Sequence, residues 1–430
     1  MVREVMNSDT ADTVVVVGGG PAGMMAAIAA ARAGQRVVLC EGQTRLGLKL
    51  LASGGGRCNL TNTLPAEEFM ARCGRHGRFM APALAHFGAD RLRGFLAELG
   101  VETHAPDARR VFPVSHQSTT VHAALVGELA RLGVEIRLGE LVTELLPEGE
   151  MLGGVATSRG RLAAGRVILA TGGRGYPPLG GGQTGYDLAR QAGHRVTQTF
   201  PAIVPLVVEE SWPGECRADT IPGATLEIRG RGRRGVRARG DLIFTERGLA
   251  GPLILDAARE ITPLLAGGEP VRAMLQLTDA DEEGWNARLA APEGREPVRR
   301  WLAQWVPASL ADVFCRLAGV EPDRETPALG QRDRHRLAAV LAQTPVTIVA
   351  SEGWDKAMVT RGGVSLKEVL PDTLASRVMP GLFLAGEALD LDGPCGGFNL
   401  QWAFASGALA GAAAHAPRCS ASPTGSEELA

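Results

Sequence analysis

The clearest pattern of hydrophobic and polar positions lies near the start of the chain. Val14–Val17 is a run of β-branched residues too short for a helix, which predicts a strand buried on both faces. After a glycine-rich turn, the apolar segment Pro21–Ala33 predicts a helix. Val37–Leu39 then predicts a second strand, with the acid Glu41 at its end. Strand, turn, helix and strand in this order are typical of the first half of a Rossmann-type sheet.

The glycines of that turn carry the first chemical signal. Gly18 permits the tight turn, Gly20 lets the backbone approach a pyrophosphate, and Gly23 lets the helix pack closely on the strand. The helix N-terminus offers free N–H groups to the phosphates. Glu41 lies 18 residues after Gly23, at the position where an acid binds a ribose diol. The motif predicts a dinucleotide site but does not separate FAD from NAD, and a glycine-rich turn in another α/β fold is the alternative.

A second unusual segment is "SGGGRCNLTN", residues 53–62. Three consecutive glycines are costly in backbone entropy, so they suggest a close approach to a ligand. We expect Gly54–Gly56 to pass near a flat ring, with Arg57 offering a fork of donors and Asn59 bonding a ring edge. The alternative is a surface loop. Cys58 is a weak candidate for a catalytic acid, and a small packed residue is the more common role for such a thiol.

The remaining pattern predicts an inserted domain. Residues 201–350 begin with short β-like segments and continue, over 282–342, with the spacing of amphipathic helices. The apolar strand Leu382–Ala385 then leads through Gly386 and Glu387 to a helix that starts near Asn399. We expect the backbone N–H groups after this strand, and the N-terminus of this helix, to face the cofactor, where its dipole stabilises negative charge by roughly 0.3–2 kcal/mol.

Composition changes this picture little. Hydrophobic residues make up 45% and charged residues 21% of the 430 residues, and the formal net charge is −2. This balance argues against a mainly electrostatic partner such as duplex nucleic acid. The seven cysteines include no Cys-x-x-Cys pair, and the N-terminus has no apolar signal segment, so we expect reduced thiols and a cytoplasmic location. The uncharged stretch Val14–Ala31 is interrupted by Gly18-Gly19-Gly20-Pro21, which disfavours a membrane span.

The arginine-rich stretch "RGRGRRGVRARG", residues 229–240, has two interpretations. It contains six arginines in 11 residues, which suggests a patch for nucleic acid or a membrane surface. No aromatic residue interleaves to stack on bases, so an arginine-rich hairpin loop is the favoured interpretation. We therefore expect a small-molecule substrate, no nucleic acid and no membrane. No metal-ligating or Ser-His-Asp constellation stands out in the sequence.

Several blocks together resemble one known family. "SGGGRCNLTN" resembles a signature of the BaiN/YhiN-type flavoproteins, also called aminoacetone-oxidase-like FAD-binding oxidoreductases. Further blocks that are similar, in the same order, are "VILATGGRGYPPLG" (167–180), "FPAIVPL" (200–206), "GDLIFTERGLAGPLIL" (240–255), "MVTRGGVSLKEVLPDTLASRV" (358–378) and "GLFLAGEALDLDGPCGGFNLQWAFASG" (381–407). Two positions depart from the family pattern: Thr184 stands where Asp is common, and Cys395 where Thr is usual.

The resemblance implies an α/β fold, with a discontinuous Rossmann-like FAD-binding domain and a β-rich and helical inserted domain. The expected boundaries are 1–200 with 351–415 for the FAD-binding domain, 201–350 for a barrel-like and helical insertion, and 416–430 for a disordered tail. A backbone contact from Val142 to adenine is also implied by the resemblance. The complete set of residues expected to bind FAD is Gly18, Gly20, Pro21, Ala22, Gly23, Glu41, Lys49, Gly55, Gly56, Arg57, Asn59, Val142, Thr171, Gly172, Gly386, Glu387, Gly397, Asn399 and Leu400.

Three functions remain open from the sequence. The leading one is an FAD-dependent oxidoreductase that transfers hydride through the flavin, with NAD(P)H as a transient donor and a small unsaturated or carbonyl compound as acceptor. No second glycine motif predicts a dedicated nicotinamide domain. An amine or amino-ketone oxidase that releases hydrogen peroxide is the first alternative. A flavin-carrying protein that binds or modifies RNA is the second.

Overall fold

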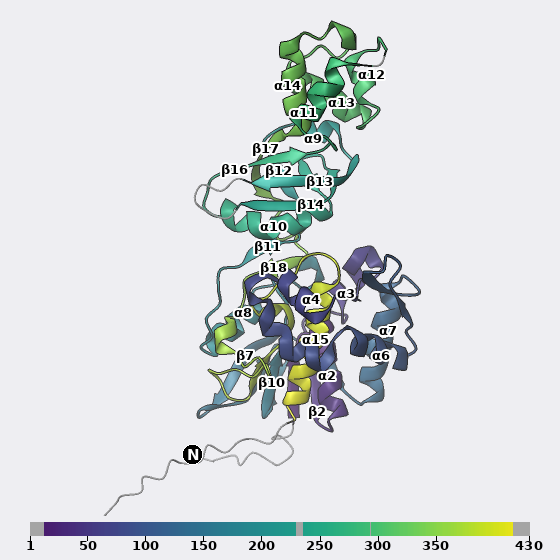
Figure 1. The fold of residues 1–430 in the computed structure, drawn as a ribbon. Helices are drawn as coiled ribbons and strands as arrows, with labels where there is room; N and C mark the ends of the chain where they lie inside the picture. Colours follow the sequence, from purple (N-terminus) through teal and green to yellow (C-terminus); the bar gives the residue numbers. More distant parts are fainter. Residues whose placement is uncertain (1–12, 229–234, 293, 416–430) are drawn as a thin grey trace, which may run out of the picture.

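The computed structural model describes residues 13–228, 235–292 and 294–415. Figure 1 shows a lower tier that holds the first and last described segments, a β-barrel above it, and a small group of helices at the far end. Of the helices in these ranges, none is both long enough and apolar enough to cross a bilayer. The stretch Val14–Ala31 forms a strand, a turn and a helix, as the sequence predicted.

A five-stranded sheet forms the centre of the lower tier, in the order β19-β10-β1-β2-β6. Each neighbouring pair in it is parallel. Its first strand, β1, is buried at every residue, which agrees with its unbroken β-branched run. Because all five strands run in the same direction, their carboxyl ends meet at one edge of the sheet. The strands are β1 (Thr13–Val17), β2 (Arg36–Glu41), β6 (Glu135–Leu138), β10 (Arg166–Leu169) and β19 (Leu382–Leu384).

The first and last helices of the described chain, α2 and α15, pack side by side, and α2 lies against this sheet (Figure 1). A Cβ at Gly407 of α15 would lie 2.2 Å from the Ala22 carbonyl oxygen of α2, and one at Gly411 would lie 2.3 Å from that of Ala26. The small residues of α15 therefore allow a close helix contact that joins the two ends of the chain. The helices of this tier are α2 (Pro21–Arg32), α3 (Leu48–Ala52), α4 (Ala66–Arg72), α5 (Ala81–Phe87), α6 (Ala89–Glu98), α7 (Ser118–Arg131), α8 (Thr184–Gln191) and α15 (Phe398–Ala413).

Three small sheets and several short 3-10 helices complete the lower tier. One of the sheets, β7-β8-β9, is an antiparallel meander. The small strands are β3 (Thr61–Asn62), β4 (Thr103–His104), β5 (Arg110–Pro113), β7 (Val142–Glu148), β8 (Met151–Thr157), β9 (Gly160–Ala163), β11 (Phe200–Ala202) and β18 (Val359–Arg361). The 3-10 helices here are η1 (Ser53–Gly56), η2 (Gly74–Met80), η3 (Pro177–Leu179), η5 (Leu366–Glu368) and η6 (Gly386–Ala388).

A closed six-stranded barrel, in the order β12-β15-β14-β13-β16-β17, forms the middle tier. Closure leaves no free edge strand. The strands are β12 (Leu206–Val208), β13 (Thr220–Ile228), β14 (Val236–Phe244), β15 (Gly248–Ala250), β16 (Val271–Gln276) and β17 (Thr344–Ser351). The helices associated with it are α9 (Trp212–Glu215), α10 (Pro252–Leu265), α11 (Glu282–Ala290), α12 (Val298–Leu302), α13 (Ala308–Ala318), η4 (Thr326–Ala328) and α14 (Gln331–Ala342).

The described residues form two large hydrophobic cores, one in the lower tier and one shared by the barrel and its helices. One joins the early and late segments around the parallel sheet, and the other extends from Val204 to Ala357 through the barrel and its helices. We propose that each core marks one domain, with the second inserted into the first. Within the arginine-rich stretch, residues 229–234 lie outside the described residues, as does the expected tail at 416–430. The strands that flank the stretch pair with each other, with Ile228 opposite Val236.

Two local features add to the sequence-based picture. Between Glu41 and the three glycines, Leu48–Ala52 forms the short helix α3. The final helix starts at Phe398, in agreement with the predicted start near Asn399.

Candidate functional site

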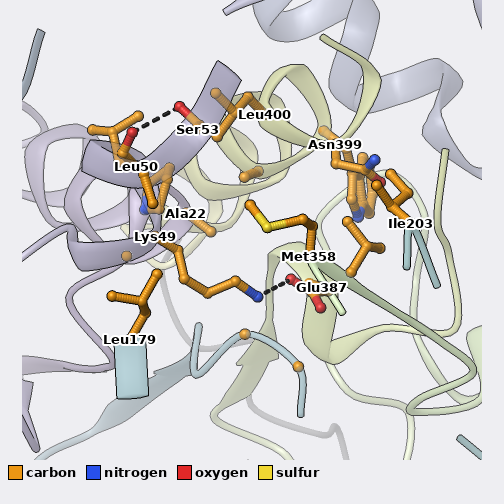
Figure 2. Close-up of a pocket in the computed structure, with 18 of the residues that line it drawn as sticks. Ala22, Lys49, Leu50, Ser53, Leu179, Ile203, Met358, Glu387, Asn399 and Leu400 are labelled. Carbon is orange, nitrogen blue, oxygen red and sulfur yellow. Dashed lines mark hydrogen bonds and ion pairs between the residues drawn. The ribbon is translucent and has the colours of Figure 1, made fainter. Parts of the chain in front are cut away.

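A cleft of about 1190 Å³ opens at the carboxyl ends of the parallel strands. This is the edge at which open α/β sheets bind their ligands. Early, middle and late segments all contribute to its wall, and Figure 2 shows Lys49, Glu387, Met358 and Leu400 around its interior. Of the residues predicted to bind FAD, all line the cleft except Gly23, Gly56 and Gly386.

The glycine turn after β1 has the geometry that its sequence suggested. Gly18 has a φ of +101°, which favours glycine. A Cβ at Gly23 would lie 1.8 Å from the Gly18 carbonyl oxygen, so this glycine allows helix and turn to touch. A Cβ at Gly20 would meet no atom within 4 Å among the described residues, because this position faces the open cleft. Gly20 is also the N-cap of α2 and no side chain caps it, so the first N–H groups of the helix are free for an anion.

Glu41 is held at the end of β2 by two backbone donors. The Gly19 N–H donates to Oε2 at 2.6 Å, and the Gln43 N–H donates to Oε1 at 2.8 Å. These bonds fix the carboxylate at the rim of the cleft, and each oxygen retains a lone pair for a further donor. The position suits a ribose diol.

We expect Glu41→Ala to weaken FAD binding by about 1.5–3 kcal/mol, or roughly 10- to 100-fold in Kd, because charged acceptor bonds to the ribose are lost. The measurement is a titration of the apoprotein with FAD. Glu135→Ala, which removes a partly exposed carboxylate from the adjacent strand, is the control. Equal Kd values for the two variants would exclude the ribose role.

The three glycines of residues 54–56 all have left-handed backbone, with φ of 58°, 66° and 83°. Gly54 and Gly55 line the cleft, whereas Gly56 does not. Arg57 follows at the exposed rim, where its Nε donates to the Gly54 carbonyl at 3.3 Å and its guanidinium lies 5.8 Å from the Phe112 ring centroid. The segment is therefore part of the cleft wall.

Cys58 is not placed for proton transfer. Its side chain is fully buried and does not line the cleft, and burial raises the pKa of its thiol to about 12. It packs in the core of the FAD-binding domain. This matches the packed interpretation of the sequence rather than the catalytic one.

An ion pair joins the early and late walls of the cleft. Lys49 Nζ lies 3.0 Å from Glu387 Oε2 (Figure 2), although the two residues are 338 positions apart. The other oxygen, Oε1, accepts the Thr360 N–H at 2.8 Å. Sequence reasoning selected Lys49 and Glu387 separately, and the structure shows that they form one unit.

Gly386 has a different role from the one expected. Its N–H donates to the Ser406 hydroxyl at 2.9 Å, so it is not available to a phosphate, and the residue does not line the cleft. A Cβ here would lie 2.8 Å from the Ala22 Cβ. Gly386 therefore serves the packing of the strand end against α2.

The loop before α15 is tied to early segments of the chain. The Asn62 Nδ2 donates to the Gly396 carbonyl at 3.0 Å. In the Asn59 orientation that gives both amide atoms a partner, the oxygen accepts the Gly397 N–H at 3.2 Å and the nitrogen donates to the Thr61 carbonyl at 3.1 Å. Asn399 accepts the Gly393 N–H at 2.8 Å, so its amide shapes the loop. The Asn59 amide, which we expected at a ring edge, is likewise bonded to backbone groups of this chain.

The middle segment contributes an unpartnered polar group. The Thr171 hydroxyl is buried at the cleft, and no described residue bonds to it. Gly172 and the buried Val142 line the same wall. A buried hydroxyl without a partner is costly, so this group suits a ligand with polar atoms.

The structure also brings together a Ser-His-acid group that the sequence did not reveal. The Ser376 Oγ lies 2.7 Å from His194 Nε2, and Glu368 Oε2 lies 3.2 Å from Nδ1. The serine oxygen also accepts the N–H groups of Val378 and Met379, and both Ser376 and His194 are buried. Burial lowers the pKa of His194. Because the hydroxyl holds a turn and faces no cleft, the group is structural.

Sequence reasoning missed cleft residues from α10 and from the ends of β5, β11 and β18. They include Leu255 and Asp256 on α10, Arg109 just before β5, Ile203 just after β11 and Met358 just before β18. One signal was present: Asp256 is a single acid between the apolar residues of "GPLILDAA". An isolated acid on an apolar helix face is worth testing as a site residue.

These features fit FAD. The cleft is large enough in volume for a dinucleotide, and it offers an uncapped helix N-terminus for a pyrophosphate and a fixed carboxylate for a ribose. The Thr171 hydroxyl and the N-terminus of α15 supply further polar groups. Among the described residues, no group of three or more His, Cys, Asp or Glu side chains could hold a metal ion.

Comparison with known proteins agrees with this geometry. A family model described as HI0933-like protein Rossmann domain matches residues 12–413. The chain is 34% identical over 414 residues to the 3-dehydro-bile acid delta(4,6)-reductase of Clostridium scindens, covering 93% of this chain and 98% of that protein. It is 30% identical over 394 residues to the ribosomal RNA dihydrouridine synthase of Escherichia coli, covering 91% and 95%.

Solved structures share the fold at low identity. The 3-ketosteroid-delta4-(5alpha)-dehydrogenase of Rhodococcus jostii aligns with a TM-score of 0.50 at 18% identity, covering 96% of this chain and 99% of that one. The 3-ketosteroid delta1-dehydrogenase of Sterolibacterium denitrificans gives 0.52 at 14%, covering 94% and 99%. The chain therefore belongs to the HI0933-like Rossmann family, the BaiN/YhiN-type flavoproteins, and is an FAD-dependent oxidoreductase.

Proposed function

We propose that this enzyme uses NAD(P)H to reduce a carbon–carbon double bond conjugated with a carbonyl group. The observation that carries the proposal is the chemistry shared by two relatives that cover more than nine-tenths of the chain. A Δ4,6 bond system beside a 3-oxo group and the C5–C6 bond of a uracil ring are both conjugated in this way. The two relatives act on different substrates but carry out the same type of reaction. We therefore expect this chain to share the reaction type, whatever its substrate.

The cleft supports a mostly apolar substrate. Ile203, Leu255 and Met358 give it an apolar wall on the barrel side, close to the loop that precedes α15. Small-molecule sites combine such walls with a few placed polar groups. When bound, FAD supplies the hydride chemistry, while the protein orients the substrate and excludes water.

The nicotinamide donor is part of the same proposal. The described residues contain one Rossmann-type glycine turn, and the inserted domain is a barrel with helices. NAD(P)H would therefore bind transiently in the same cleft and leave before the substrate enters.

Anaerobic mixing tests the proposal. We expect NADPH or NADH to bleach the visible flavin band of the purified protein rapidly, and an enone such as 2-cyclohexen-1-one to restore it. Bleaching by an amine, with hydrogen peroxide released in air, would instead identify an amine or amino-ketone oxidase. Absence of bound or bindable FAD would contradict both.

RNA is a second candidate substrate, favoured by one structural observation. The relatives include two named ribosomal RNA dihydrouridine synthases, at 30% and 27% identity. Six exposed arginines line the cleft, and phosphate contacts of this kind give salt-dependent binding. They are Arg45, Arg57, Arg72, Arg109, Arg110 and Arg239.

Charge-reversal variants distinguish binding of RNA at the arginines that line the cleft from binding at the arginine-rich stretch. Binding of a ribosomal RNA transcript would be compared at low and high salt for Arg57→Glu/Arg239→Glu and for Arg231→Glu/Arg233→Glu/Arg234→Glu. Loss of binding in the first variant alone would favour RNA entering the cleft. No binding by the unmodified protein at low salt would exclude this candidate.

A further inference from the structure

Two acids from residues 201–350 line the cleft, the exposed Asp241 on β14 and the half-buried Asp256. Asp256 lies on α10, the helix that lies between the barrel and the FAD-binding tier in Figure 1. Its Oδ1 accepts the Cys395 N–H at 2.6 Å, and both residues line the cleft. Cys395 belongs to the loop that leads to the N-terminus of α15, so the carboxyl group lies at the wall where the reactive ring is expected.

The position of this acid is fixed from both sides. One turn further along α10, Arg259 forms a buried ion pair with Asp392, and its Nη2 donates to the Asp392 carbonyl at 2.8 Å. On the loop side, Asn399 accepts the Gly393 N–H. Helix and loop are therefore held together, and Asp256 has little freedom to leave the cleft wall.

The surroundings of Asp256 favour its protonated form. Burial raises its pKa, and this effect outweighs the hydrogen bonds from Cys395 and the positive charges of Arg259 and Arg109, which act in the opposite direction. Burial also raises the pKa of the Cys395 thiol, with the Asp256 charge as the second cause. Both groups therefore keep their protons to higher pH than usual.

We propose that Asp256 is the proton donor to the substrate, an inference that rests on the proposed function. Saturation of a conjugated double bond adds a hydride to the carbon distant from the carbonyl and a proton to the carbon beside it. NAD(P)H supplies the hydride through the cofactor. Asp256 releases its proton to the second carbon, and the carboxylate then takes a proton from water.

The contact between Asp256 and Cys395 is made through the backbone N–H of Cys395, whatever the side chain at this position. Cys395→Thr should therefore keep the acid in place. Asp256→Asn keeps the size and the acceptor for the Cys395 N–H but removes the proton.

Separate half-reactions test the proposal. For Asp256→Asn, we expect flavin reduction by NAD(P)H to be unchanged and reoxidation by 2-cyclohexen-1-one or 4-androstene-3,17-dione to slow by about 10²- to 10⁴-fold. In the unmodified enzyme the reoxidation rate should fall as pH rises through the pKa of the acid, and the variant should lose this dependence. Glu260→Gln, which removes an exposed carboxylate on the same helix outside the cleft, should retain the rate and the pH profile. An unchanged reoxidation rate in Asp256→Asn would overturn the proposal.

A second readout does not depend on the substrate. An infrared difference spectrum between the unmodified holoenzyme and Asp256→Asn, recorded over a pH series, should contain a protonated carboxyl band that persists to higher pH than that of an ordinary aspartic acid, whose pKa is about 3.9. Absence of this band would overturn the role of Asp256. If the band is present but neither enone reoxidises the enzyme, the proposed substrate class is wrong. The result would still show that Asp256 is protonated.

Discussion

Replacing Gly23 by alanine is expected to destabilise the FAD-binding domain and abolish FAD retention. The new Cβ would lie 1.8 Å from the Gly18 carbonyl oxygen and 3.0 Å from its carbonyl carbon. Both atoms are backbone, so α2 must move away from β1 or the turn must open. Overpacking of this kind costs about 1–3 kcal/mol or more, and the displaced helix N-terminus also loses its alignment with the pyrophosphate. Chemical denaturation of the apoprotein and FAD titration measure the two effects.

Two glycine variants provide controls for this result. Gly127 is an exposed residue of α7, and a Cβ added there would have no atom of the described residues within 4 Å, so Gly127→Ala should stabilise by about 0.5–1 kcal/mol. Gly20→Ala should leave stability unchanged, since its Cβ would enter the open cleft, but should still weaken FAD binding. If Gly20→Ala bound FAD normally, the pyrophosphate would not lie at this turn.

Replacing Asp392 by leucine is expected to cost about 3–5 kcal/mol of stability, because it leaves the Arg259 guanidinium buried without its counter-ion. Arg259 and Asp392 are 8% and 7% exposed. Arg361 lies 3.7 Å from the other carboxylate oxygen but keeps a second partner, Glu260, at 3.0 Å, so the loss of the counter-ion falls mainly on Arg259. We expect the loop that carries Cys395 to become more mobile, and FAD to bind more weakly because this loop forms part of the cleft wall.

A double-mutant cycle separates charge from packing in this contact. Arg259→Met/Asp392→Leu removes both charges at similar volume, and such replacements are often neutral. We expect the double variant to recover most of the stability lost in Asp392→Leu, as measured by chemical denaturation. Equal losses in the single and double variants would mean that packing, not the buried charge, dominates.

The cofactor turn was predictable because its signals are local. The β-branched run of β1, the spacing of Gly18, Gly20 and Gly23 and the acid at the end of β2 all lie within one strand–helix–strand unit. Each follows from sterics and hydrogen bonding over a few residues. The same holds for the helices of residues 282–342, whose apolar spacing indicated their type.

Closure of the barrel and the partners of single residues were not predictable in this way. Lys49 and Glu387, Arg259 and Asp392, and Asp256 and Cys395 are separated by 338, 133 and 139 positions. No periodicity links such residues. Gly386 illustrates the same limit, since its sequence context suggested a phosphate contact while the Ser406 hydroxyl of a later helix takes its N–H.

The sequence by itself determined a dinucleotide-binding turn and the helical segments of residues 282–342, because glycine spacing and apolar periodicity constrain the backbone locally, while its resemblance to a known family implied FAD and the inserted domain. Only the tertiary structure decided which side chains meet in the cleft. The reason is physical: the close packing of α15 on α2 brings the last segment onto the first, and α10 then places Asp256 from the inserted domain against that last segment.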